Sequence, residues 1–291
     1  MWHIHASSVT GRSHQRSGLP LQDRTFAWTE NSVTAAALSD GAGSAALSQE
    51  GAESAVRQTA IFLCRHFEQL YGAETPAALR RSILTQAQEA VGCRAREIGV
   101  SPGELACTLM AVAVKEDRYL IFHIGDGIVA YQKEGAVKVA SAPWNGEFAN
   151  ETVFLTSPDA LRRCKVYKGT QPKLEGFCLM SDGSGGALYD KRRNRTAPIL
   201  KILMQQVQLL DPGTVKELLE GVMGEIIAAR SQDDCSLILL TRKGERFGRW
   251  ETMTSREKAA VLGIQTRDRS KKRRQIRRYA EAYGITESEM I

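Results

Sequence analysis

Short runs in which apolar and polar residues alternate recur along this chain, and a period of two is typical of β-strands. Neighbouring runs meet at Glu30-Asn31 and at Glu134-Gly135, and we expect a short turn at each. The segment from Gly11 to Leu21 is rich in Ser, Gly and Pro, which predicts a loop. The predicted strands are Trp2–Val9, Arg24–Thr29, Ser32–Ser39, Thr108–Val114, Tyr119–Ile124, Ile128–Gln132, Ala136–Ala140, Gly176–Ser181 and Cys235–Thr241.

Four longer segments carry apolar residues at helical spacing instead. Pro76 and Pro212 each stand near the start of such a segment, where proline is tolerated. The order along the chain is strands, two helices, many strands, two helices and one strand. This order differs from the strict alternation of a parallel α/β sheet, and it predicts an α+β fold of antiparallel sheets with helices outside. The predicted helices are Gln49–Tyr71, Thr75–Ile98, Ala197–Gln208 and Pro212–Arg230.

The composition is that of a globular protein, since 43% of the 291 residues are hydrophobic and 25% are charged. There is no apolar run of membrane-spanning length, and Met1 to Thr10 lacks the pattern of a secretory signal. The six cysteines form no C-x-x-C pair and mostly lie in apolar runs, as in Phe177-Cys178-Leu179-Met180. Buried free thiols explain them better than disulfides or structural zinc, so we expect a cytoplasmic protein with no membrane contact.

The positive charge is confined to the end of the chain. Residues 243–291 hold 13 of the 39 Lys and Arg and 7 of the 33 Asp and Glu, and this excess of six equals the net charge of +6. Residues 1–242 are therefore neutral, and we predict a domain over residues 1–242 and a basic, helical extension over 243–291. Thr254-Ser255-Arg256-Glu257 has the form of a helix capping box.

The extension contains eight cations between Arg267 and Arg278. Such a run binds nucleic acid, an acidic protein face or a partner kinase, or it is simply a solvated helix face. The candidate partner-binding residues are Lys271, Lys272, Arg273, Arg274, Arg277 and Arg278.

Aspartates stand at the ends of several predicted strands. Asp40, Asp126 and Asp182 each follow an apolar strand and precede a glycine, Asp233-Asp234 precedes the last strand, and Asp23 precedes an early one. Carboxylates at the ends of adjacent strands converge at one rim, and hard cations such as Mg²⁺ or Mn²⁺ prefer oxygen ligands. The alternative is that Asp-Gly is turn chemistry only.

In motif order, residues 1–242 resemble the metal-dependent, type 2C family of protein phosphatases. The family's Asp-Gly-x-Gly and Ser-Asp-Gly motifs are intact, and its other motifs are matched more loosely. Its last motif, for example, is Asp-Asn, where this chain has Asp233-Asp234. The matching segments are Gln22-Asp23, Asp40-Gly41-Ala42-Gly43, Ala106-Cys107-Thr108, Gly125-Asp126-Gly127, Ser181-Asp182-Gly183 and Asp233-Asp234-Cys235-Ser236.

The resemblance implies an α-β-β-α sandwich, in which two antiparallel sheets are flanked by antiparallel helix pairs. It implies hydrolysis of phosphoserine and phosphothreonine in proteins by a hydroxide that bridges two Mn²⁺ or Mg²⁺ ions, with a third, weaker metal site. The expected partners are phosphoprotein substrates and a cognate Ser/Thr kinase, and the expected state is a monomer.

The resemblance also assigns roles to individual residues. Asp40 is expected to bridge the two metals and Gly41 to offer its carbonyl oxygen. Asp23 is expected to bind one metal, and Asp182 and Asp233 the other. Asp126 is expected to help hold the third, weaker metal.

Three positions depart from the family pattern. Ala42 stands where a histidine proposed as general acid is common, Gly18 where a phosphate-gripping arginine is common, and Gln22 where glutamate is more usual. His14 and Arg16, in the loop before Asp23, are the candidates for the missing proton donor and cation. The alternative is that His14 is a loop residue that only forms a hydrogen bond.

These departures leave two other functions open. The domain could be a catalytically silent, phosphatase-like binding module, although a silent domain has no need of five clustered carboxylates. The chain could also be a nucleic-acid-binding protein, although residues 1–242 carry no net charge.

Overall fold

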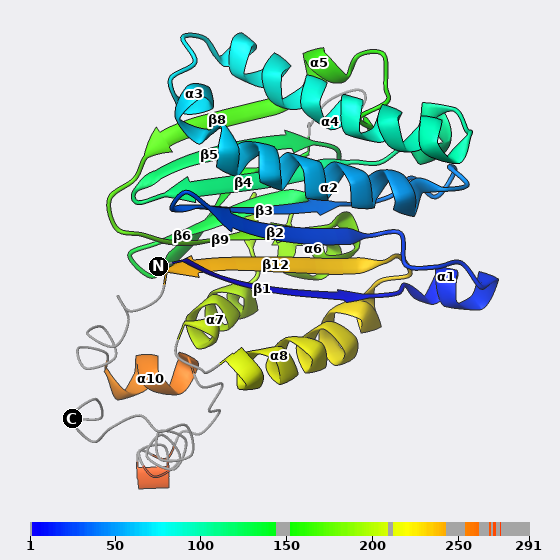
Figure 1. The fold of residues 1–291 in the computed structure, drawn as a ribbon. Helices are drawn as coiled ribbons and strands as arrows, with labels where there is room; N and C mark the ends of the chain where they lie inside the picture. The colour runs from blue at the N-terminus through cyan, green and yellow to red at the C-terminus, as the bar shows by residue number, and fades with distance from the viewer. Residues whose placement is uncertain are drawn as a thin grey trace.

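Two five-stranded antiparallel sheets pack face to face, with helices on both outer surfaces (Figure 1). The computed structural model describes residues 2–143, 152–208, 212–242 and 254–261, together with 268, 270, 271 and 274. The first sheet has the strand order β2-β3-β4-β5-β8 and the second the order β1-β12-β9-β6-β7. The predicted α+β sandwich of two antiparallel sheets is therefore confirmed.

The strands agree closely with the alternating runs of the sequence. In the first sheet they are β2 (Arg24–Glu30), β3 (Val33–Ser39), β4 (Leu109–Lys115), β5 (Arg118–Ile124) and β8 (Lys165–Thr170). In the second they are β1 (Trp2–Val9), β6 (Ile128–Lys133), β7 (Ala136–Ser141), β9 (Leu174–Met180) and β12 (Cys235–Arg242). A small separate hairpin pairs β10 (Tyr189–Asp190) with β11 (Arg195–Thr196).

Helices cover the outer face of each sheet (Figure 1). The first sheet is covered by α2 (Ser48–Arg65), α3 (Phe67–Tyr71) and α4 (Pro76–Ile98). The second is covered by α7 (Pro198–Val207) and α8 (Pro212–Gly221), and α8 continues as a π-helical turn (Val222–Ile227) and a 3₁₀ turn (Ala228–Arg230). Shorter helices are α1 (Arg12–Ser17), a 3₁₀ turn (Pro102–Leu105), α5 (Ala160–Arg163), α6 (Asp182–Leu188) and α10 (Ser255–Val261).

Two predictions about individual elements were wrong, and one edge strand was missed. The loop predicted from Gly11 to Leu21 contains α1, which has no buried residue and therefore no apolar period to detect. The helix predicted over Gln49–Tyr71 is interrupted at His66, between α2 and α3. The polar edge strand β8 was not predicted, because its residues are half-buried or exposed.

The strands of the sandwich centre are apolar on both faces because each lies between two hydrophobic layers. In β3, Ala35 and Ala37 pack in the layer beneath α2 and α4. Ala36 and Leu38, from the same strand, pack in the layer between the sheets. Alternate residues point to opposite faces of a strand, so one strand serves two cores. A third apolar layer lies between the second sheet and its helices.

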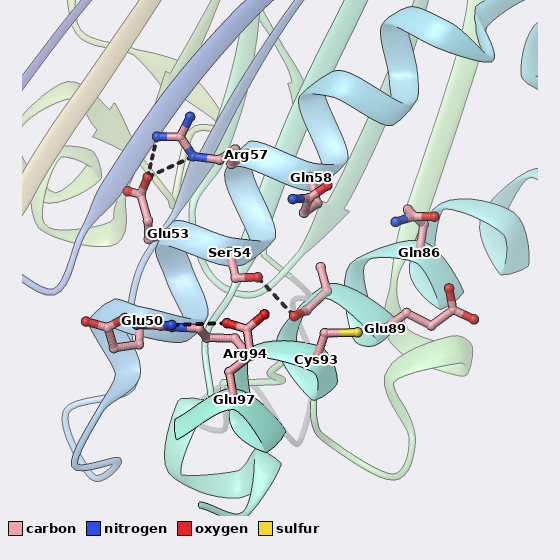
Figure 2. A pocket seen from close by; sticks show the side chains of 11 residues that line it. Glu50, Glu53, Ser54, Arg57, Gln58, Gln86, Glu89, Cys93, Arg94 and Glu97 are labelled. Atoms are coloured by element: carbon pink, nitrogen blue, oxygen red, sulfur yellow. Dashed lines mark hydrogen bonds and ion pairs between the residues drawn. The ribbon is translucent and has the colours of Figure 1, made fainter. Parts of the chain in front are cut away.

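A polar groove runs between α2 and α4 on the outer surface (Figure 2). Its charged side chains form ion pairs across and along the helices, such as Arg94 Nη2 to Glu50 Oε2 at 2.7 Å and Arg57 Nη2 to Glu53 Oε1 at 2.9 Å. The groove is lined only by α2 and α4 and includes none of the predicted metal ligands. Cys93 lies in this groove and is the exposed member of six free cysteines.

The start of the basic extension packs onto the domain. Helix α10 contacts α7, and Ala259 on α10 is buried. Lys271 and Arg274 are exposed, whereas Lys272, Arg273, Arg277 and Arg278 lie outside the described residues. Residues 243–253 lie outside them too, so the domain boundary at 242 stays a prediction.

In the described part of the chain, no helix has both the length and the apolar character needed to cross a bilayer.

Two helical glycines give a matched test of this packing. A Cβ atom on Gly51 of α2 would lie 2.0 Å from the Leu105 carbonyl oxygen, whereas the nearest contact for one on Gly92 of α4 is a flexible arginine tip at 3.5 Å. We expect Gly51→Ala to lower the free energy of unfolding by about 2–3 kcal/mol, because α2 must move away from the 3₁₀ turn. Gly92→Ala should raise it by about 0.5–1 kcal/mol through helix propensity. Urea denaturation measures both, and equal effects would contradict the close approach.

Candidate metal centre

Three aspartates from both sheets meet at one end of the sandwich. Asp40 follows β3 and Asp126 follows β5 in the first sheet, and Asp182 follows β9 in the second. One carboxylate oxygen from each lies within 4.8 Å of the others. The face-to-face packing of the sheets therefore places side chains more than 140 residues apart in sequence at one point.

Threonine side chains fix two of these aspartates. The Asp40 N–H donates to Thr108 Oγ1 at 2.9 Å, and the Thr108 N–H donates to the Asp40 carbonyl at 2.8 Å. Thr152 Oγ1 donates to Asp126 Oδ2 at 2.6 Å. Gly125 has φ +116°, and a Cβ there would lie 2.5 Å from Thr108 Cβ, so the turn before Asp126 requires glycine. Sequence analysis did not assign a role to Thr108 or Thr152.

The clustered carboxylates repel one another. Burial, followed by the charges of Asp23, Asp182 and Asp126, raises the pKa of Asp40 well above its ordinary value. Burial and the charges of Asp126 and Asp233 raise the pKa of Asp182 to about 6. Without a cation, burial and mutual repulsion make the charged forms of these groups costly, and a divalent ion would remove that cost.

Asp23 is the most deeply buried of these carboxylates, with 1% of its surface exposed. Burial raises its pKa to about 7; the nearby Ser236 and Ser181 hydroxyls oppose this shift and the Asp234 charge adds to it. Neither Asp23 oxygen accepts a hydrogen bond from the described residues. Orphaned buried carboxylate oxygens beside other carboxylates fit Mg²⁺ or Mn²⁺, since both favour hard oxygen donors.

The remaining predicted ligands are less closely defined. Asp233 is exposed, and its charge contributes to the raised pKa of Asp182. At Gly41, the bridge to Cys107 uses the Asp40 carbonyl and the Ala42 N–H, rather than the Gly41 carbonyl. The structure thus brings Asp23, Asp40, Asp126 and Asp182 together, and their roles as ligands stay predictions.

The structure shows the surroundings of the three residues that depart from the family pattern. Ala42 is buried beside Ala45, Ala106 and Phe154, so an apolar contact replaces a proton donor. Gly18 ends α1 in the left-handed conformation, with φ 68°. Gln22 is 3% exposed, and its Oε1 atom has no hydrogen-bond partner among the described residues.

His14 lies on α1, and Arg16 is exposed on the same helix. His14 Nδ1 is 3.0 Å from Asp234 Oδ1, which is an ion-pair distance, although the two atoms lack hydrogen-bond alignment. His123 is buried, its Nδ1 lies 2.7 Å from Ser141 Oγ, and burial lowers its pKa to about 3.

Asp234 is a buried residue to which the sequence analysis gave no role. Its two oxygens accept hydrogen bonds from the Gly11 and Gln22 N–H groups at 2.7 and 2.6 Å. The one feature of the sequence that could have pointed to Asp234 is that the last motif of the family has asparagine at this position.

A family model described as "Protein phosphatase 2C" matches residues 10–223, which is well over half of the chain. The chain therefore belongs to the protein phosphatase 2C family, and it is a protein phosphatase of that metal-dependent class. The matched region contains Asp23, Asp40, Asp126 and Asp182 and ends before Asp233.

Individual proteins agree with this assignment. The chain is 29% identical over 181 residues to serine/threonine-protein phosphatase 3 of Escherichia coli (strain K12), a match that covers 58% of this chain and 68% of that protein. A crystal structure of a bacterial serine phosphatase has a TM-score of 0.59 at 15% identity, over 84% of this chain and 99% of that one. The serine/threonine phosphatase Stp1 of Staphylococcus aureus has a TM-score of 0.57 at 14% identity, over 84% and 96%. These structures share the fold.

The raised pKa values predict how stability depends on pH. In metal-free protein the folded-state pKa values of about 7 for Asp23 and about 6 for Asp182 exceed the ordinary 3.8, so the folded state binds more protons than the unfolded state. Stability should therefore fall as pH rises from about 4 to about 7. With chelator, we expect the Tm to decrease over this range, and Mn²⁺ to restore it most at the upper end.

Thermal denaturation with chelator and with Mn²⁺ measures this effect. Asp40→Asn removes one of the repelling charges and should flatten both responses. A Tm in chelator that is independent of pH, with no gain from Mn²⁺, would contradict the proposed cluster of repelling carboxylates.

Proposed function

We propose that this protein hydrolyses phosphoserine and phosphothreonine in phosphoprotein substrates, with two Mn²⁺ or Mg²⁺ ions and a third, weaker ion at the candidate metal centre. The convergence of Asp40, Asp126 and Asp182 from two sheets, beside the orphaned carboxylate of Asp23, carries this proposal. The resemblance to enzymes named as serine and serine/threonine phosphatases supports the choice of substrate.

Each aspartate has a defined task in this proposal. Asp40 would serve both of the two ions, Asp23 would help to hold one and Asp182 and Asp233 the other, and Asp126 would help to hold the third. Bound divalent ions supply an activated water near neutral pH and offset the negative charge of the phosphoryl group. The carboxylates come from rigid strand ends, so they need little rearrangement to hold this geometry.

The chain must also supply a proton and attract the phosphate group. In the proposal His14 gives a proton to the leaving oxygen of the substrate, and Arg16 is a cation at the approach to the site. His14 is supported by its contact with Asp234, whose charge also acts on Asp23. Arg16 is supported by its exposed position on the same short helix.

Removal of a ligand carboxylate tests the proposal. We expect Asp40→Asn and Asp182→Asn to lower kcat/KM on a phosphothreonine peptide by on the order of 10²–10³-fold, because the cation site loses charge. Chelator should abolish hydrolysis of the peptide by the unmodified enzyme, and added Mn²⁺ or Mg²⁺ should restore it.

Asp159→Asn is the matched control, because Asp159 is a carboxylate beside α5 that pairs with Arg163 and lies outside the cluster. Its activity should be unchanged. If the unmodified protein binds the phosphopeptide without hydrolysing it in Mn²⁺, the alternative of a silent binding module is correct.

The basic extension supports a second, separate proposal: it binds a polyanionic partner such as nucleic acid or the acidic face of a cognate kinase. The concentration of cations after Arg267 carries it. Because α10 packs on α7, truncation should begin after α10. Deletion of residues 267–291 should abolish retention on immobilised nucleic acid at low salt and leave peptide hydrolysis unchanged. Retention that survives the deletion would rule out the extension as the binding element.

A further inference from the structure

Asp234 connects the segment before β12 to residues 11–22 at the candidate metal centre. It directly follows Asp233, precedes β12 and is 1% exposed. Its Oδ1 atom accepts from the Gly11 N–H at 2.7 Å and lies 3.0 Å from His14 Nδ1, while Oδ2 accepts from the Gln22 N–H at 2.6 Å. All three partners lie more than 200 residues earlier in the sequence.

These partners are the start, the middle and the end of one segment, residues 11–22. The segment is held at its other contacts too, since the N–H and Oγ of Ser13 both donate to the Gln232 carbonyl, at 2.9 and 2.7 Å. A Cβ on Gly11 would lie 2.3 Å from the Asp233 carbonyl carbon, so the two backbones are in close contact. Asp234 therefore fixes helix α1 and also the backbone of Gln22, which directly precedes Asp23.

A carboxylate suits this position better than the asparagine of the resembling motif. Two backbone N–H donors point at its two oxygens, and an amide would present an NH₂ group to one of them. A carboxylate also provides a negative charge for the imidazole of His14. This chain thus combines Asp234 with His14 on α1, while Ala42 stands at a position where it cannot donate a proton.

We propose that Asp234 is a positioning residue that holds His14 in place as the proton donor to the leaving oxygen; this inference rests on the proposed function. Asp234 Oδ1 lies 3.0 Å from Nδ1, so Nε2 is the ring nitrogen that remains to donate a proton to the substrate. Apo geometry of catalytic hydrogen bonds is often loose and tightens with substrate bound. In the reaction, the oxygen of water bonds to phosphorus and the bond from phosphorus to the threonine oxygen breaks. The threonine oxygen keeps the electron pair and takes the proton from Nε2. The attacking water keeps one proton on the phosphate product and releases the other to solvent, and a proton from solvent then returns to Nε2 of His14.

The test compares leaving groups that do and do not need a proton. The threonine alkoxide of a phosphopeptide needs one, whereas the nitrophenolate of p-nitrophenyl phosphate does not. We expect His14→Ala to lower kcat on the peptide by about 10²-fold, and its loss on p-nitrophenyl phosphate to be at least about tenfold smaller. Asp234→Asn should show the same selectivity, and the double variant should be no worse than His14→Ala alone, because the two residues act together.

Asp190→Asn is the matched control. The Asp190 carboxylate also accepts two backbone hydrogen bonds, from Arg192 and Arg193 at 3.0 and 3.1 Å, in an exposed turn between β10 and β11. Its kinetics on both substrates should be unchanged. His14→Ala leaves the backbone bonds of Asp234 in place, so it decides the question even if Asp234→Asn unfolds.

Three results would overturn the proposal. Equal losses of kcat on the two substrates would show that the substitution damages the metal centre. Losses that multiply in the double variant would show that His14 and Asp234 act independently. Full peptide activity of His14→Ala would show that this histidine gives no proton. The last result, with an active unmodified enzyme, would overturn the role of His14 and leave the proposed metal-dependent hydrolysis intact. An unmodified enzyme that is inactive on both substrates with Mn²⁺ would instead overturn the proposed function itself.

Discussion

Repulsion between buried carboxylates is the constraint on which this structure depends. Asp40, Asp126 and Asp182 lie within 4.8 Å of one another, and Asp23 is buried beside them without a hydrogen-bond partner among the described residues. Burial of unpaired negative charge is costly, and a divalent cation is the simplest counter-charge. The two sheets supply carboxylates from opposite sides of this cluster. The packing of the sheets against each other therefore also determines the arrangement of the candidate metal centre.

An early and a late segment of the described chain lie side by side in the second sheet and meet at this end of the sandwich. Strand β1 pairs with β12 along its whole length, from Trp2 opposite Arg242 to Val9 opposite Cys235. Asp234 extends this pairing with side-chain contacts to the segment before Asp23. Predicted ligands that are distant in sequence, such as Asp23 and Asp233, therefore lie on neighbouring stretches of backbone, which gives the candidate centre a defined frame. The loss of a proton donor at Ala42 and the presence of the His14–Asp234 contact are consistent with one compensating for the other.

Much of the fold could be predicted because the central strands are buried on both faces and leave long apolar runs, as in β3. The Asp-Gly pairs at strand ends marked the acidic cluster for a similar reason, since the aspartate follows directly on a recognisable strand. Helix α1 and strand β8 were missed because they are polar and lie at the edge. The role of Asp234 depends on contacts across more than 200 residues, which no local pattern encodes. Thr152 was missed because its contact with Asp126 spans 26 residues, which is also beyond the reach of a local pattern.

Anomalous diffraction from crystals of the protein grown with Mn²⁺ tests the central claim most directly. The account predicts anomalous peaks at coordination distance, roughly 2.0–2.6 Å, from carboxylate oxygens of Asp40 and Asp182, with Asp23 beside one of them. A map without peaks between these aspartates, or with manganese bound only elsewhere on the molecule, would contradict it.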